Sequence, residues 1–171
     1  RHYTGGDSPS LSKMGGADFA RTKAKVASEV ATIAQELVVL YQKRVNARGH
    51  AFGEDTPWQK EMEDAFPFAE TPDQLQAIAD VKEDMEAERP MDRLVIGDVG
   101  FGKTEVAIRA AFRVAMSGRQ VAVLCPTTVL AQQHYLNFRA RYAEHPIEVR
   151  SLSRFVDKEE EVKVVQGLKD G

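Results

Sequence analysis

One octapeptide has the residue types and spacing of a phosphate-binding site. Residues 97–104 read Gly-Asp-Val-Gly-Phe-Gly-Lys-Thr and fit the P-loop pattern G-x-x-x-x-G-K-S/T. Gly100 and Gly102 allow a tight turn and a close approach to a phosphate, because no Cβ stands in the way. Backbone N–H groups and the N-terminus of the next helix would then face the phosphate. The predicted nucleotide-contacting residues are Gly97, Asp98, Val99, Gly100, Phe101, Gly102, Lys103 and Thr104.

Two side chains of this loop are predicted to take part in catalysis. The Lys103 ammonium would reach the β- and γ-phosphates, and the Thr104 hydroxyl would ligate Mg²⁺. The alternative is a glycine-rich turn that carries Lys-Thr by chance. The flanking residues favour the P-loop, because a short apolar strand pattern at 93–97 precedes it and a helix pattern at 103–117 follows it.

The pattern of strand followed by helix continues beyond the loop. Strands are predicted at 120–125 and 147–152, and helices at 128–143 and 157–169. Such alternation predicts an α/β fold in which helices flank a parallel sheet. Pro-Thr-Thr at 126–128 follows the second strand, where functional loops lie. Thr127 and Thr128 could hold a nucleic-acid phosphate at the helix N-terminus, or could form a plain helix cap.

The first half of the chain predicts a linker and three helices. Residues 1–16 are rich in Gly, Ser and Pro, as in a loop or linker. Residues 17–48 have an apolar stripe at three- and four-residue steps, which predicts one long helix that ends at Gly49. That helix either bridges two domains or packs along the core of one. A short helix starting at Pro57 and another from Thr71 to about Glu88 follow.

Bulk composition excludes several classes of protein. Hydrophobic residues make up 43% and charged residues 29% of the 171 residues, as in an ordinary globular protein. A net charge of −3 does not indicate a strongly basic nucleic-acid module. The chain has one cysteine, Cys125, which fits a reducing cytosol, and it has no apolar run of about 18 residues to cross a membrane. The histidines are scattered and suggest no metal site.

Several segments resemble one family. The P-loop, together with Pro-Thr-Thr-Val-Leu-Ala-Gln-Gln-His at 126–134, resembles motifs I and Ia of superfamily 2 helicases and translocases, in the form of the RecG-like subgroup. The segment 66–78 is similar to the adenine-recognising Q-motif region of that subgroup. Within the RecG-like subgroup, the chain most resembles the Mfd family of bacterial transcription-repair coupling factors. This resemblance rests on residues 1–6, 11–16, 66–68 and 152–155.

The resemblance implies an ATP-driven motor on double-stranded DNA, in the bacterial cytoplasm, that displaces stalled RNA polymerase. Residues 1–16 would be the tail of a polymerase-interacting module, and residues 17–48 the connecting helix. Residues 55–171 would be the first, incomplete part of a RecA-like translocase lobe. The implied cofactors are ATP and Mg²⁺. The implied partners are double-stranded DNA, RNA polymerase and, through other parts of the protein, nucleotide-excision-repair proteins.

The resemblance also assigns side chains outside the loop. Gln74 would bond the N6 and N7 edge of adenine, because an amide both donates and accepts. Phe68 would stack on the purine, or else belong to the core. Arg154 would contact a DNA phosphate, or else be an ordinary surface arginine.

One expected part of the motor is missing from the sequence. The family's Asp-Glu-x-His stretch, which serves Mg²⁺ and the attacking water, does not occur in residues 1–171. We therefore expect the chain to bind ATP without efficient turnover when alone. The alternatives are a RecG-type replication-fork helicase, a P-loop kinase or regulatory nucleotide-binding module without motor activity, and a non-enzymatic piece that docks on a polymerase.

Overall fold

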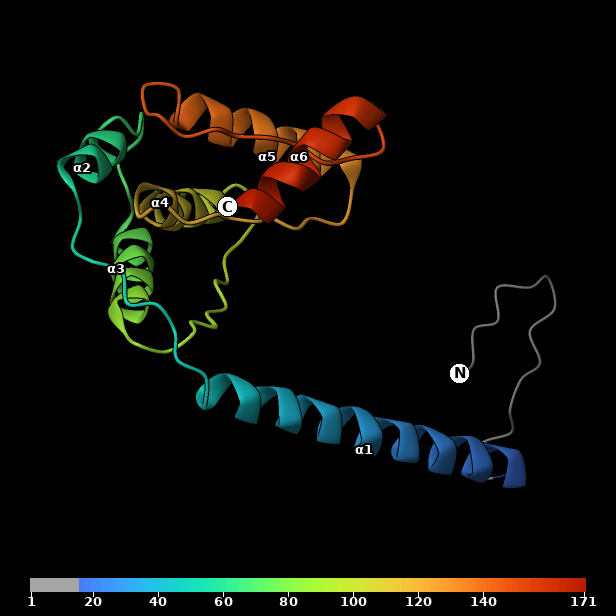
Figure 1. Cartoon of the computed structure of the whole chain (residues 1–171). Helices are drawn as coiled ribbons and strands as arrows, with labels where there is room; N and C mark the ends of the chain where they lie inside the picture. The colour runs from blue at the N-terminus through green and yellow to red at the C-terminus, as the bar shows by residue number, and fades with distance from the viewer. Residues whose placement is uncertain (1–15) are drawn as a thin grey trace. The chain divides into compact units, whose positions relative to one another are not determined.

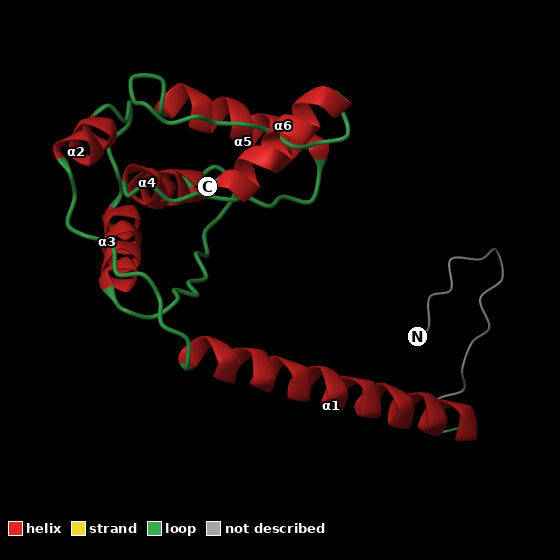
Figure 2. Ribbon diagram, in the orientation of Figure 1, coloured by secondary structure: helices red, strands yellow, loops and turns green. Residues whose placement is uncertain are grey.

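The computed structural model describes residues 16–171, so the tail predicted for residues 1–16 lies outside the described residues, apart from Gly16. The chain divides into two compact units, residues 1–47 and residues 48–171. In the described part of the chain, helices are joined by loops and turns (Figures 1 and 2).

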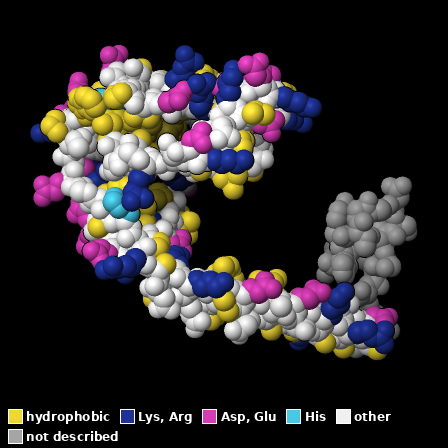
Figure 3. Space-filling model, viewed as in Figure 1, with side chains coloured by type: hydrophobic (Ala, Val, Ile, Leu, Met, Phe, Trp, Pro, Cys, Tyr) yellow, Lys and Arg dark blue, Asp and Glu magenta, His cyan; other side chains and the backbone are white. Residues whose placement is uncertain are grey.

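The first unit contains the long helix α1 (Ala17–Val45), which ends slightly before the predicted Arg48. Its apolar stripe is present, but no residue of α1 is buried, and Val26, Ile33 and Leu37 are exposed. Figure 3 shows hydrophobic side chains at the surface of α1 beside charged ones. The predicted helix is confirmed, and its role as a connector stays a prediction.

The second unit contains the five other predicted helices, which are confirmed close to their predicted bounds. Side-chain caps begin all of them except α4: for example, the Thr56 hydroxyl accepts from the backbone N–H of Gln59, and the Asp157 carboxylate accepts from that of Glu160. The helices are α2 (Pro57–Asp64), α3 (Pro72–Glu86), α4 (Lys103–Met116), α5 (Thr128–Arg141) and α6 (Lys158–Asp170).

Helix α4 is the centre of this unit, because both apolar clusters include it. On one side Val106 packs with three residues of α3, namely Ile78, Val81 and Met85. On the other side Phe112, which is fully buried, packs with residues of α2 and α5. Figure 1 shows α4 between α3 and α5, with α2 at its end. The helix that begins at the P-loop is therefore held on two sides.

The predicted parallel sheet is wrong, because residues 16–171 contain no strand. The segments 93–97, 120–125 and 147–152 have no regular secondary structure and form no backbone ladder with one another. Val95 and Val149 pack on the helix clusters, whereas no residue of 120–125 does so and Leu124 is 98% exposed. The apolar, β-branched composition of these segments suits a half-buried extended chain, but a strand also requires a paired neighbour.

Candidate functional site

The P-loop has a backbone that only glycine adopts easily. The Phe101 N–H donates to the Asp98 carbonyl at 3.4 Å, which closes a turn in which Gly100 has φ +85°. Gly102 has φ +69° and is the N-cap residue of α4. Two left-handed glycines thus turn the chain directly into the helix, so that Lys103 and Thr104 are the first two residues of α4.

The Lys103 ammonium lies back over the loop. Its Nζ donates to the carbonyls of Gly97 and Asp98, each at 2.6 Å. A Cβ at position 97 would lie 3.4 Å from the Cγ of Lys103, so the lysine stem crosses this glycine closely. The ammonium is therefore exposed beside the loop and bonded only to neutral acceptors, which a phosphate could replace as a stronger, charged acceptor.

Gln74 connects the start of α3 to the P-loop. Its Oε1 accepts from the Thr71 N–H at 2.8 Å, and the Thr71 hydroxyl accepts from the Gln74 N–H at 3.2 Å, which forms a capping box. Its Nε2 donates to the Phe101 carbonyl at 3.0 Å. An amide has a second N–H and a second acceptor lone pair, so Gln74 keeps the capacity to bond a ligand as well.

The two phenylalanines of the Q-motif region have different surroundings. Phe68 is 70% exposed, whereas Phe66 is half-buried, and their rings meet edge to face with centroids 5.5 Å apart. The guanidinium carbons of Arg109 and Arg141 lie 5.4 and 5.5 Å from the centroid of the Phe66 ring. Phe66 is thus held within the protein, and Phe68 is the ring open to a ligand.

The predicted DNA-contacting residues take no part in the hydrogen bonds of the P-loop. The Thr127 hydroxyl accepts from the Leu130 N–H at 3.3 Å and so caps α5, and Thr128 is the first residue of that helix. The guanidinium of Arg154 lies 5.0 Å over the Phe155 ring. Within residues 16–171, no hydrogen bond or ion pair joins these three residues to residues 97–104.

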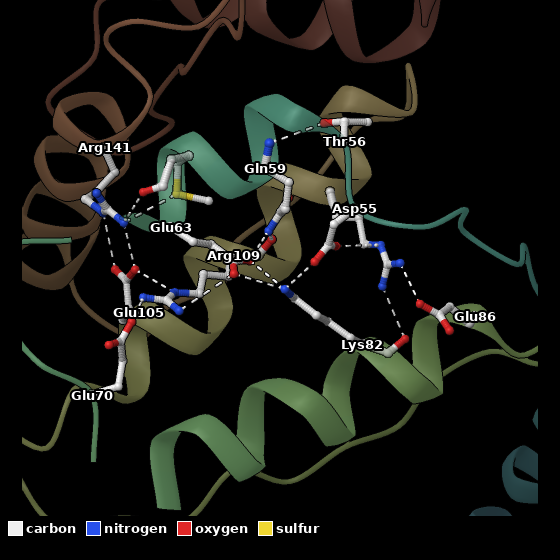
Figure 4. Close-up of polar contacts among 12 residues, drawn as sticks. Asp55, Thr56, Gln59, Glu63, Glu70, Lys82, Glu86, Glu105, Arg109 and Arg141 are labelled. Carbon is white, nitrogen blue, oxygen red and sulfur yellow. Dashed lines mark hydrogen bonds and ion pairs between the residues drawn. The ribbon is translucent and has the colours of Figure 1, made fainter. Parts of the chain in front are cut away.

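A network of charged side chains around α4 was not predicted from the sequence. Glu105, Arg109 and Arg113 recur every fourth residue on α4, and all three are buried. Together with their charged partners and the neutral amide of Gln59, these residues form what we call the α4 network (Figure 4); its members are Asp55, Gln59, Glu63, Glu70, Lys82, Glu86, Glu105, Arg109, Arg113 and Arg141. The sequence signal for burial of these charges was their four-residue spacing, which places them on the apolar side of the helix and not on its solvent face.

The network connects the P-loop helix to its neighbours by charge-assisted bonds. Glu105 accepts from Arg109 at 2.9 Å and from Arg141 of α5 at 2.8 Å. Arg113 bonds Glu86 of α3 at 2.6 Å. Burial by itself lowers the pKa of Arg109, but its hydrogen bonds to Glu70 and Glu105 outweigh this and raise the pKa. The hydrogen bond from Arg109 likewise lowers the pKa of Glu70, so both members of the pair stay charged.

Gly102→Ala tests whether the loop needs its left-handed glycine. An alanine at φ +69° is strained by about 1–2 kcal/mol, and its Cβ would lie 2.6 Å from the Nε2 of Gln74. We expect a lower free energy of unfolding in urea and loss of the Gln74 contact. The control is Gly167→Ala within α6, where a Cβ meets nothing within 4 Å and should raise stability by about 0.5–1 kcal/mol. Equal effects of the two substitutions would contradict the strain.

Comparison with known proteins adds three findings. Residues 71–169 match the model of the DEAD/DEAH box helicase family. Transcription-repair-coupling factors of Mycobacterium bovis and Mycobacterium tuberculosis are each 56% identical over 169 residues, and that of Bacillus subtilis is 51% identical over 166 residues. These alignments cover 99%, 99% and 97% of this chain, but it spans only 14% of the length of each relative.

A solved structure is also similar. The chain of RecG bound to a three-way DNA junction superposes with a TM-score of 0.71 at 32% sequence identity. The match covers 77% of this chain and 18% of that one. In the part of the chain that the structure describes, no helix is long and apolar enough to cross a membrane.

Proposed function

Because the chain belongs to the DEAD/DEAH box helicase family, we propose that it is the ATP-binding part of a double-stranded DNA translocase that couples transcription to DNA repair. The names of the curated relatives support the coupling role, and the DNA junction in the RecG structure supports DNA as the track. The whole activity belongs to a longer protein, since the chain spans 14% of those relatives.

The observation that carries the proposal is the shape of the P-loop. Gly100 and Gly102 have positive φ angles, and α4 begins directly after Gly102. The Lys103 ammonium lies beside the loop at the positive end of the helix dipole. A lysine, a hydroxyl and a helix N-terminus form a donor set that fits a nucleoside triphosphate with its Mg²⁺. When bound, Mg²⁺ would neutralise developing phosphate charge, with the Thr104 hydroxyl as a ligand.

In this proposal each group of the chain has a defined task. Lys103 leaves the Gly97 and Asp98 carbonyls and donates to the β- and γ-phosphates. Gln74 uses its free N–H and lone pair on the adenine edge while it keeps its bond to Phe101, and Phe68 stacks on the base. Residues 97–104 surround the phosphates. Equilibrium dialysis of the chain with labelled ATP and Mg²⁺ tests the proposal, and absence of saturable binding would refute it.

Gln74→Ala is expected to reduce the preference for ATP over GTP by about tenfold. An amide that both donates and accepts distinguishes the adenine edge from the guanine edge, and a lost bond of this kind is worth about 1.4 kcal/mol. Competition between ATP and GTP for the chain measures the preference. The control is Gln76→Ala on the same helix, where the amide bonds Asp80 instead of the loop. Unchanged discrimination in Gln74→Ala would argue against the adenine role.

The DNA-facing part of the proposal involves α5 and the loop after residue 152. The N–H groups at the N-terminus of α5, with the hydroxyl of Thr128, would bind a backbone phosphate, and Thr127 would cap the helix. Arg154 would contact a second phosphate through its guanidinium. Contacts to phosphates do not depend on the base sequence, and a translocase that moves along any DNA requires such contacts.

The remaining parts of the proposal concern organisation. Residues 1–16 would end a polymerase-interacting module, residues 17–48 would be the connecting helix, and residues 55–171 would begin the first motor lobe. RNA polymerase and excision-repair proteins would contact mainly other parts of the longer protein, acting in the bacterial cytoplasm. The expectation that this chain binds ATP without efficient turnover when alone stays a prediction.

A RecG-type helicase is the second candidate, because the solved RecG structure superposes over 77% of the chain. The higher identity to the coupling factors, 56% over 99% of the chain, favours the first. Both candidates share the nucleotide site. They differ in partner, so binding of RNA polymerase by the longer protein distinguishes them.

A further inference from the structure

Arg109 contacts Phe66 and Glu70, the residues two positions before and two positions after Phe68. Its side chain is 4% exposed, six residues after Lys103 on α4. The Nη2 donates to Glu70 at 2.5 Å, and the guanidinium lies 5.4 Å from the centroid of the Phe66 ring. The Phe66 ring in turn packs edge-on against the Phe68 ring. The segment that carries Phe68 is therefore attached to α4 on both sides of that residue.

The geometry of these contacts fixes the orientation of the segment 66–70 relative to α4, in addition to holding it there. A guanidinium is a planar fork, and Glu105 at 2.9 Å fixes a second edge of it. Glu105 also accepts from Arg141, whose guanidinium lies over the same Phe66 ring. An apolar contact would leave the loop free to slide, whereas these paired bonds define one position for it. Figure 4 shows Glu70, Arg109, Glu105 and Arg141 close together, with their carboxylates and guanidiniums facing one another.

We propose that Arg109 is a positioning residue for base binding, which acts through Glu70 and Phe66 to hold Phe68 at a fixed place relative to Lys103. Lys103 and Arg109 are on one helix, about 9 Å apart along its axis at 1.5 Å per residue. The helix thus carries the phosphate-binding group at its start and the anchor of the base-stacking segment further along. This inference rests on the proposed ATP site and deepens it.

Glu70→Gln is the test, because it weakens the anchor without removing a buried side chain. Glu70 is 25% exposed, so the variant keeps the fold. We expect affinity for ATP, measured by titration calorimetry, to fall about tenfold, within the range for loss of a base–aromatic stack. Affinity for inorganic tripolyphosphate, which has no base, should change by less than about twofold. Glu70→Asp, which keeps the charge, should retain most of the ATP affinity.

Two reference variants separate positioning from stability. Glu86→Gln weakens another bond from a carboxylate to a buried arginine of α4, Arg113, but this bond joins α4 to α3 and not to the segment that carries Phe68. It should leave both affinities unchanged. Phe68→Ala should remove the base contribution and so resemble Glu70→Gln.

The outcomes are distinguishable. If Glu70→Gln changes neither affinity, or lowers both equally, the positioning role is overturned while the ATP site stands. If Phe68→Ala leaves ATP affinity unchanged, stacking and with it the positioning role are overturned. If the wild-type chain binds neither probe, the proposed function itself is wrong.

Discussion

Lys103→Ala should weaken binding of ATP by about 100-fold. Hydrogen bonds to charged partners contribute up to about 3 kcal/mol, and alanine removes the cation that lies beside the P-loop. The fold should be nearly unaffected, because in this structure the ammonium bonds only two backbone carbonyls at the exposed loop, which water can satisfy in its place. Titration calorimetry with ATP and Mg²⁺ measures the loss, and urea unfolding measures the stability.

Lys163→Ala is the matched control for this substitution. Lys163 lies on α6 and pairs with Glu159 one turn away at 2.7 Å, as an exposed lysine commonly does. The Lys163→Ala variant should bind ATP with the affinity of the wild-type chain. Wild-type affinity in Lys103→Ala would contradict the assignment of residues 97–104 as the phosphate site.

The second large effect concerns stability. Arg109→Met should lower the free energy of unfolding by about 3–5 kcal/mol, the range for removal of one partner from a buried ion pair. The methionine fills the space but leaves Glu105 with only Arg141 and leaves Glu70 without a cation. Urea unfolding followed by circular dichroism measures the change.

Arg150→Met provides the comparison. Arg150 also bonds two carboxylates, Glu148 and Glu160, but it is half exposed. Water screens such a pair, so the substitution should not measurably change the unfolding midpoint. Equal destabilisation by the two substitutions would show that burial does not determine the importance of the α4 network.

The helices and their caps were predictable because their determinants are local. Thr56 and Pro57 begin α2, and Thr71 with Gln74 forms the capping box of α3, all within four residues of sequence. The same holds for the P-loop, in which glycine spacing and the following helix set the left-handed turn. The bond from Gln74 to Phe101 was not predicted, since it joins residues 27 positions apart. The adenine-binding role of Gln74 stays a prediction.

The α4 network could not be predicted, because its partners come from distant segments. Glu70 and Arg109 are 39 positions apart, and Glu105 and Arg141 are 36 apart. A sequence shows that a charge lies on an apolar face, but not which opposite charge neutralises it there. Burial of these arginines is possible only because the folded chain supplies carboxylates from α2, α3 and the loops at residues 55 and 70.

The glycine-rich turn at 97–104 and the six described helices follow from the sequence alone, since each depends on residues within one or two turns of one another. The family also follows from the sequence, because its motifs recur over residues 71–169. The tertiary structure was needed to show that the three segments predicted as strands are unpaired and that buried charges surround α4. A strand requires a second strand at hydrogen-bonding distance, and a buried ion pair requires its partner in contact. Both are properties of segments that meet in space, which neither composition nor periodicity records.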